Sequence, residues 1–186
     1  MEAVKEIKLN KIAKIILAAV LGTLLLTISA KIKIPFYPVP MTMQTFMVLF
    51  LGITLGPKIG LLTISLYLFE GIFGLPVFAG TPEKGIGLIY FTGPTMGYLI
   101  GFLVAVYLAG SFKYDKGIIN TFLKLIFSIS FIYILGMIWL GILIGWDKPI
   151  FKLGAQPFLL AELFKMLLLL FLTPTLLKAK KLIKVT

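Results

Sequence analysis

Long apolar runs, separated by short groups of lysine, glycine or proline, make up most of this sequence and limit the folds open to it. Hydrophobic residues make up 60% of its 186 residues, whereas soluble domains are about 45–50% apolar. A helix of about 20 apolar residues crosses a bilayer. Six runs are found, at about 12–30, 43–55, 58–73, 94–111, 117–144 and 157–178. We therefore expect an all-α membrane protein, a compact bundle of six transmembrane helices formed as a single domain by residues 1–186.

Two stretches rich in proline and glycine interrupt these runs. The first, KIKIPFYPVPMT at 31–42, contains three prolines that disfavour a helix. The second, GIFGLPVFAGTPEKGIGLIYFTGP at 71–94, is typical of a long structured loop or hairpin. We interpret the first stretch as a stiff aromatic lid over a binding site.

The lysines predict the topology. Six spans place both chain termini on one side of the membrane, and the side richer in lysine is cytoplasmic. One face collects the N-terminal lysines, Lys58 and the lysines at 113–116 and 178–184, whereas the other keeps Lys31, Lys33, Lys84, Lys148 and Lys152. Both termini are therefore expected in the cytoplasm, with both proline- and glycine-rich loops and the start of the last helix outside.

The composition also excludes several classes of function. The chain has no cysteine and no histidine, which excludes thiolate chemistry, Cys/His metal sites and imidazole catalysis. Its net charge of +11 comes from lysines beside apolar spans, a pattern that suits an anionic lipid surface rather than nucleic acid. A phosphate-binding loop is absent, so the chain is not expected to hydrolyse ATP itself. We expect no metal and no cofactor.

Glu162 and Lys165 lie within the apolar sequence FLLAELFKMLLLLFL, three residues apart on one helical face. Each charge costs about 2.5–3.5 kcal/mol at the centre of a membrane helix, so a partner must compensate for it. We interpret the pair as an inward-facing ligand clamp, in which the carboxylate accepts N–H groups and the ammonium pairs with an acid. The alternative is a structural ion pair near the membrane interface, with Lys165 extending toward the headgroups.

Other polar residues offer weaker signals. Two compatible roles are open for Thr42. It caps the second helix, or it contacts a ligand below the lid together with Gln44. Glu70 is a second carboxylate near the outer end of the third run, where a loop lysine or solvent is its expected partner. The first run also contains the small residues Ala18, Ala19, Gly22 and Thr23. Such residues allow either close helix packing within the chain or docking of another subunit.

Five motifs in order resemble a known family. They are IPFYPVPMTMQTF, LGPKIG, YLFEGIFGLPVFAG, FTGPTMGYLIGF and AQPFLLAELFK. Together they are similar to the BioY family, the biotin-specific substrate-binding (S) components of energy-coupling-factor (ECF) transporters. The resemblance extends from the first helix to the sixth.

The resemblance implies a multi-pass protein of the cell membrane that is not an enzyme. It implies that biotin binds from outside, under the loop between the first two helices. It also implies partners: a transmembrane coupling subunit, docked on small residues of the first helix, and two cytoplasmic ATPase subunits. The S component is thought to topple within the bilayer to deliver its ligand.

The resemblance also assigns roles to residues. Glu162 stands where the family has Asp, and it is expected to accept a ureido N–H of biotin. Lys165 is expected to pair with a ligand oxygen, most simply that of the valerate. Gly80 or Thr81 stands where the family has a polar ureido contact, so a backbone group is expected there. Tyr90 and Tyr98 are expected to close the apolar part of the site.

Three alternatives remain open from the sequence. The first is an S component for another small carboxylate-bearing vitamin, and the second is a stand-alone biotin carrier driven by an ion gradient. The third alternative is an intramembrane enzyme that uses Glu70 and Glu162.

Overall fold

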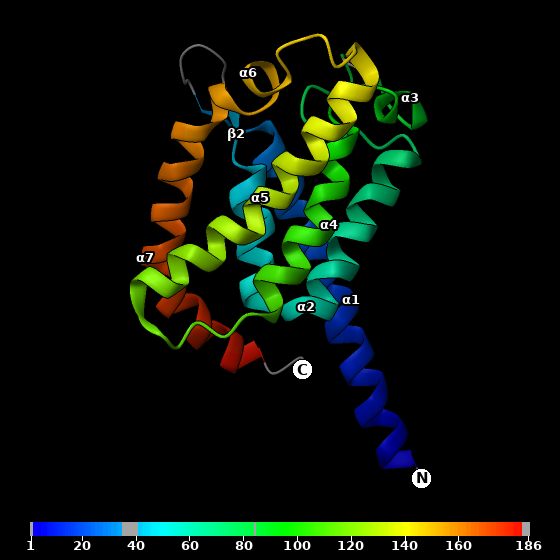
Figure 1. Ribbon diagram of the computed structural model, residues 1–186. Helices are drawn as coiled ribbons and strands as arrows, with labels where there is room; N and C mark the ends of the chain where they lie inside the picture. The colour runs from blue at the N-terminus through cyan, green and yellow to red at the C-terminus, as the bar shows by residue number, and fades with distance from the viewer. Residues whose placement is uncertain (1, 35–40, 84, 184–186) are drawn as a thin grey trace.

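Five long helices form the body of the computed structural model, which describes residues 2–34, 41–83 and 85–183 (Figure 1). They are α1 (Glu2–Lys31), α2 (Gln44–Ile72), α4 (Met96–Ser111), α5 (Gly117–Ile144) and α7 (Leu159–Ile183). The short elements are β1 (Lys33–Ile34), β2 (Met41–Thr42), α3 (Leu88–Phe91), α6 (Ile150–Gly154) and the 3-10 helix η1 (Gln156–Phe158). Helix α2 is central, because it packs against α1, α4, α5 and α7.

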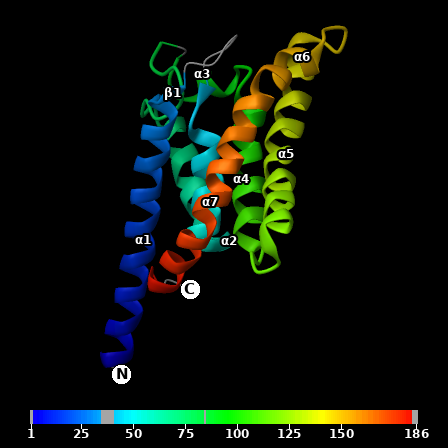
Figure 2. The same ribbon diagram turned by 90° about the vertical axis from the view of Figure 1, so that its left-hand side faces the viewer.

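Helix α2 consists of two helices that fold back on each other at Gly56 and Pro57. Gly56 has a φ of 77° and a ψ of 176°, a conformation that glycine adopts readily and other residues avoid. Gln44 and Tyr67 are hydrogen-bonded at 2.8 Å, although a straight helix would separate them by about 35 Å. The reversal is visible in Figures 1 and 2. The prediction of six helices is therefore confirmed.

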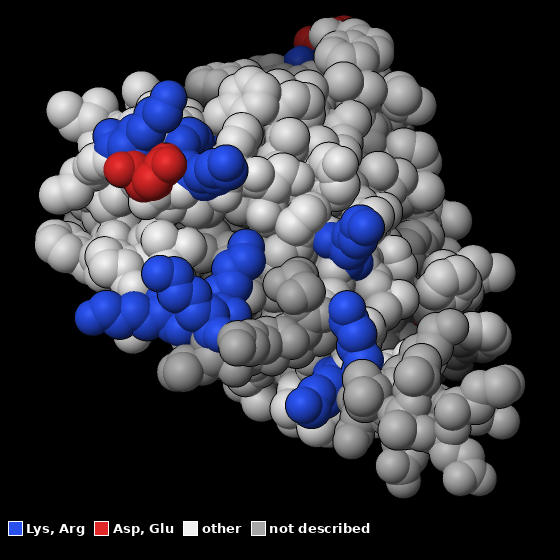
Figure 3. Space-filling view, turned by 90° about the horizontal axis from the view of Figure 1, so that it is seen from below, with Lys and Arg blue, Asp and Glu red and all other residues white. Residues whose placement is uncertain are grey.

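The two ends of the bundle differ (Figures 1 and 2). The end where α1 begins and α7 ends, here called the terminal end, also holds the turn within α2 and the α4–α5 connection. The opposite end, here called the loop end, holds β1, β2, α3, α6 and the segments around them. Both terminal helices reach the same end, as an even number of spans predicts. Viewed from below, the terminal end carries several separate groups of lysine side chains (Figure 3).

The surface of the bundle is strongly apolar. Four helical segments in the described part of the chain are long and apolar enough to cross a membrane when the two halves of α2 are taken as one segment, and α4 is a shorter apolar helix. Large hydrophobic side chains such as Leu24, Phe127 and Phe171 are exposed along the long helices. A surface of this kind suits lipid rather than water, and helices meet the bilayer's demand that backbone groups be hydrogen-bonded internally.

Several element boundaries differ from those predicted. The sixth run begins at Leu159, not 157, because the chain first forms α6 and η1, which the apolar pattern did not reveal. The cap prediction for Thr42 is wrong, because Thr42 lies in β2 and the residue before α2 is Met43, which makes no side-chain cap. The proline-rich lid at 35–40 lies outside the described residues, whereas the flanking strands pair Lys33 with Thr42.

Candidate functional site

Helix α7 directs Glu162 and Lys165 into the bundle, as the sequence predicted. Their residues are 3% and 5% exposed, whereas Leu160 and Phe164 on the other side of α7 are 55% and 59% exposed. The charged face of the helix is thus its buried face. This reverses the usual arrangement in water and is expected when the surroundings are lipid.

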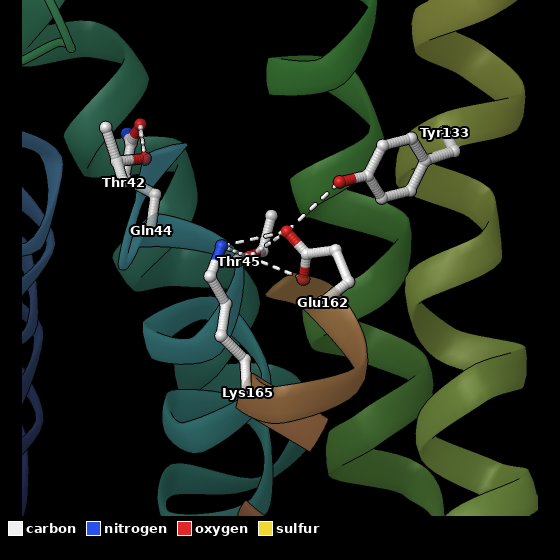
Figure 4. Close-up of polar contacts among 6 residues, drawn as sticks. All are labelled: Thr42, Gln44, Thr45, Tyr133, Glu162 and Lys165. Atoms are coloured by element: carbon white, nitrogen blue, oxygen red, sulfur yellow. Dashed lines mark hydrogen bonds and ion pairs between the residues drawn. The ribbon is translucent and has the colours of Figure 1, made fainter. Parts of the chain in front are cut away.

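Four side chains from α2, α5 and α7 form one polar network (Figure 4). The Lys165 ammonium lies 2.9 Å from Oε1 of Glu162. The Thr45 hydroxyl lies 2.9 Å from each carboxylate oxygen and accepts a hydrogen bond from Lys165 at 3.1 Å. The Tyr133 hydroxyl donates to Oε1 of Glu162 at 3.0 Å. We call Thr45, Tyr133, Glu162 and Lys165 the ion-pair network.

The ion-pair network has unused hydrogen-bonding capacity. Oε1 of Glu162 receives contacts from Lys165, Tyr133 and Thr45, whereas Oε2 shares only the Thr45 hydroxyl among the described residues. The Lys165 ammonium has three N–H groups and two acceptors in the described chain, Thr45 and Glu162. Further acceptor capacity on Oε2 of Glu162 and one N–H of Lys165 therefore remain without a partner among the described residues, in a buried setting where a polar ligand group gains most from satisfying them.

This geometry bears on the alternative that Glu162 and Lys165 form a structural ion pair near the membrane interface. Glu162 and Lys165 do neutralise each other as an ion pair. Extension of Lys165 toward the headgroups is wrong, because its ammonium is buried and faces Glu162 inside the bundle.

The predicted ligand residues Gln44 and Thr42 lie beside the ion-pair network without contacting it (Figure 4). The Gln44 amide donates to the Tyr67 hydroxyl at 2.8 Å, and that hydroxyl donates to the carbonyl of Val77 at 2.9 Å. Thr42 makes a long contact of 3.4 Å with Oε1 of Gln44. Gln44 is 6% exposed and directly precedes Thr45, so the two polar groups are adjacent in the chain.

The predicted residues Tyr90, Gly80 and Tyr98 fall on two sides of the site. The Tyr90 hydroxyl donates to the carbonyl of Ala79 at 2.8 Å, next to Gly80, and burial raises the pKa of Tyr90. Tyr98 donates to the carbonyl of Gly154 at 2.7 Å, and its ring meets that of Tyr133 edge to face with centroids 6.0 Å apart. Tyr98 therefore supports the ion-pair network, whereas Tyr90 and Gly80 belong to the loop beside Gln44.

Sequence reasoning missed Tyr133 and did not assign Thr45 a role with Glu162. Tyr133 is a hydroxyl-bearing residue in the apolar run of α5, and its partner Glu162 is 29 residues away. The sequence does indicate that the Glu162 carboxylate, placed in an apolar run, needs hydrogen-bond donors. It does not indicate which helix supplies them.

The small residues of α1 pack within the chain. Ala19, Gly22 and Thr23 are buried, and a Cβ on Gly22 would lie 2.5 Å from Cγ2 of Thr63 in α2. Ala18 is half-buried. Packing within the chain, one of the two interpretations of these small residues, therefore describes Ala19, Gly22 and Thr23, whereas docking of another subunit on α1 stays a prediction.

Glu70 and Glu162 belong to separate networks. Glu70 accepts a hydrogen bond from the Thr23 hydroxyl of α1 at 2.9 Å. No lysine of the described chain forms an ion pair with Glu70, so the expected lysine partner is not found there. The same part of the chain holds no cluster of three or more carboxylates that suits a metal ion.

Comparison with known proteins identifies the family. The BioY family model matches residues 3–182. The chain belongs to the BioY family. It is 36% identical over 153 residues to the probable biotin transporter BioY of Pyrococcus horikoshii, covering 82% of this chain and 90% of that protein. It is 34% identical to the biotin transporter BioY of Thermotoga maritima, covering 77% and 84%.

A solved structure supports the same assignment for this BioY protein. The crystal structure of the S-component for biotin from an ECF-type ABC transporter superposes with a TM-score of 0.73 at 26% identity. The match covers 91% of this chain and 93% of that structure. Together with the apolar helices, the family identifies a multi-pass membrane protein with relatives named as transporters.

Proposed function

We propose that this BioY protein is the biotin-binding S component of an ECF-type vitamin uptake transporter in the cell membrane. The names of the relatives and of the superposed structure support this proposal. The observation that carries it is the buried ion-pair network, in which the described residues leave acceptor capacity on Glu162 and one N–H of Lys165 without a partner.

Biotin matches these two groups chemically. Its ureido ring presents N–H donors beside a carbonyl, its fused ring and valeryl chain are apolar, and its tail is a carboxylate. In our proposal Oε2 of Glu162 accepts a ureido N–H and Lys165 donates to a ligand oxygen. Because the two groups belong to an ion pair only 2.9 Å across, the ureido carbonyl is the favoured partner of Lys165. The valerate oxygen remains the alternative partner.

Biotin methyl ester separates these two orientations, because it keeps the ureido ring and removes the tail charge. If Lys165 holds the ureido carbonyl, the ester retains most of the affinity of biotin in isothermal titration. If Lys165 holds the valerate, the ester binds at least about tenfold more weakly, as expected for loss of a buried charge pair.

We further propose that the loop end faces outside and the terminal end faces the cytoplasm. Described lysines at or near the terminal end include Lys58, Lys113, Lys116 and the lysines of the last turns of α7, and cytoplasmic faces carry such an excess. The chain has no cysteine, so single cysteines introduced at Glu83 and at Lys113 report the topology cleanly. An impermeant maleimide should label the first and not the second in intact cells; the reverse pattern contradicts the orientation.

Energy and partners follow from the same proposal. Since the chain lacks a phosphate-binding loop, a transmembrane coupling subunit and two ATPase subunits would supply ATP-driven uptake. Vesicles that contain this chain alone should bind biotin without accumulating it under an imposed ion gradient. Accumulation under those conditions would instead establish the gradient-driven carrier.

Titration of the purified protein with biotin in detergent tests the proposal directly. We expect tight, saturable binding that Glu162→Ala and Lys165→Ala abolish, whereas Lys152→Ala, an exposed lysine of α6, leaves it unchanged. A protein that binds another small vitamin acid and ignores biotin would overturn the choice of ligand.

A further inference from the structure

Lys31, the last residue of α1, contacts a loop about 50 residues away in the sequence. Its ammonium donates to the carbonyl of Phe78 at 3.0 Å, to the carbonyl of Thr81 at 2.7 Å and to the Thr81 hydroxyl at 2.9 Å. All three N–H groups of the ammonium therefore have acceptors, and all three acceptors are neutral. Within the described residues, no carboxylate lies at ion-pair distance from Lys31.

The contacted loop, residues 77–81, is here called the strap. Four of its five carbonyls accept hydrogen bonds from side chains of three other elements. Tyr67 of α2 donates to Val77, Lys31 of α1 to Phe78 and Thr81, and Tyr90 of α3 to Ala79. Buried carbonyls need such donors, and in loops side chains must supply them. The position of the strap is thus set jointly by α1, α2 and α3.

The strap also fits tightly against the bundle. Phe78 is 1% exposed, and its ring lies against those of Tyr67, Tyr90 and Phe91 with centroids 5.2, 4.8 and 5.4 Å away. A Cβ on Gly71 would lie 2.0 Å from the Phe78 ring, so this contact depends on a glycine. Any shift of the strap away from α1 must move this aromatic group.

The strap is connected to the ion-pair network through α2. The Tyr67 hydroxyl that donates to Val77 accepts a hydrogen bond from Gln44. Gln44 is followed by Thr45, which contacts both oxygens of Glu162. A path of hydrogen bonds and two peptide links, Val77–Phe78 and Gln44–Thr45, therefore joins the end of α1 to the candidate ligand site.

We propose that Lys31 is a positioning residue for ligand binding: it fixes the strap to the end of α1 and thereby holds the wall formed by Tyr67 and Gln44 beside the ion pair. The effect of Lys31 on ligand binding rests on the proposed function. The role of Lys31 is distinct from that of Lys165, which contacts Glu162 in the ion-pair network. Release of the strap would open the site and shorten the residence time of the ligand.

Lys31→Met tests this role, because methionine keeps much of the aliphatic side chain and removes the three donors. Lys33→Met is the matched control, since Lys33 is an exposed lysine two residues further along the same end. Hydrogen exchange of peptides covering the strap is measured without ligand, and biotin dissociation is measured by stopped flow on the same proteins.

We expect Lys31→Met to raise strap exchange and to speed biotin dissociation by about tenfold each, as loss of hydrogen bonds from a charged donor implies. Exchange in α4 and α5 and the thermal midpoint should stay close to those of the wild type, which a general loss of stability would not allow. Lys33→Met should match the wild type in every measurement. Unchanged strap exchange and an unchanged dissociation rate in Lys31→Met would overturn the inference.

Thr81→Val keeps the inference testable if Lys31→Met does not fold. It removes one of the three acceptors of Lys31 and also the hydrogen bond that the Thr81 hydroxyl donates to the Phe78 carbonyl, and it should speed dissociation by about threefold; no change in the rate would overturn the role of Lys31 in binding. Failure of the wild-type protein to bind biotin overturns the proposed function instead. The exchange measurement needs no ligand, so it still decides whether Lys31 holds the strap.

Discussion

The ion-pair network and the strap are two polar regions of the loop end, and each is organised around one lysine. Lys165 is 5% exposed and contacts a carboxylate, whereas Lys31 is exposed and, among the residues with a described structure, donates to carbonyl and hydroxyl oxygens alone. A charge removed from water needs an opposite charge, while an ammonium near the surface is satisfied by neutral acceptors. The first arrangement therefore suits ligand recognition, and the second suits holding a loop in place.

The largest effect is expected from breaking the ion pair. Glu162→Ala or Lys165→Ala leaves a buried charge without its partner, which costs about 3–5 kcal/mol. Both variants should lose biotin binding by more than about a hundredfold and melt at lower temperature. Titration calorimetry and thermal unfolding measure the two effects.

The double variant Glu162→Gln with Lys165→Met is the control for this comparison. It removes both charges, so much of the stability should return while biotin binding stays lost. Recovery of binding in the double variant would show that the pair serves folding alone.

Tyr133→Phe should have the next largest effect. It deletes one hydrogen bond to a buried carboxylate, which is worth about 1.5–3 kcal/mol. Biotin affinity should fall about tenfold or more, with Tyr107→Phe on the exposed side of α4 as the control. Equal affinities of these two variants would remove Tyr133 from the site.

A smaller effect is expected in the strap region from Tyr67→Phe. The variant removes the donor to Val77 and the acceptor for Gln44, both neutral groups, so each bond is worth about 0.5–1.5 kcal/mol. Affinity measured by calorimetry should fall by about threefold to tenfold. A larger loss than that of Tyr133→Phe would reverse the ranking of the two regions.

Glu70→Gln should have the smallest effect. Glu70 is half-buried and contacts Thr23 outside both polar regions, so biotin affinity should stay within about twofold of the wild type. Titration of this variant beside Glu162→Gln compares the two intramembrane carboxylates directly. A comparable loss in both would revive a shared role for them, as the enzyme alternative requires.

Much of the fold was predictable because lipid imposes simple demands on a sequence. The apolar runs and the inward direction of Glu162 and Lys165 follow from the cost of exposing polar groups to hydrocarbon. The break at Gly56 and Pro57 follows from the backbone preferences of glycine and proline. Partners were not predictable in the same way. Tyr133 of α5 contacts Glu162 of α7, a pairing that depends on how the helices pack. Lys31 contacts backbone carbonyls, and because every residue carries one, the sequence does not single out its partners. The small residues around Gly22 indicated that α1 packs closely against another helix, but they did not indicate which helix that is.

The proposal that Glu162 and Lys165 bind biotin is best tested by a structure of the protein with biotin bound. We expect a ureido N–H within hydrogen-bonding distance of Oε2 of Glu162, a ligand oxygen at the Lys165 ammonium, and Thr45 and Tyr133 still in contact with the carboxylate. Biotin located elsewhere, with the contacts of Glu162 and Lys165 unchanged and hydrocarbon side chains packed around them, would contradict the proposal.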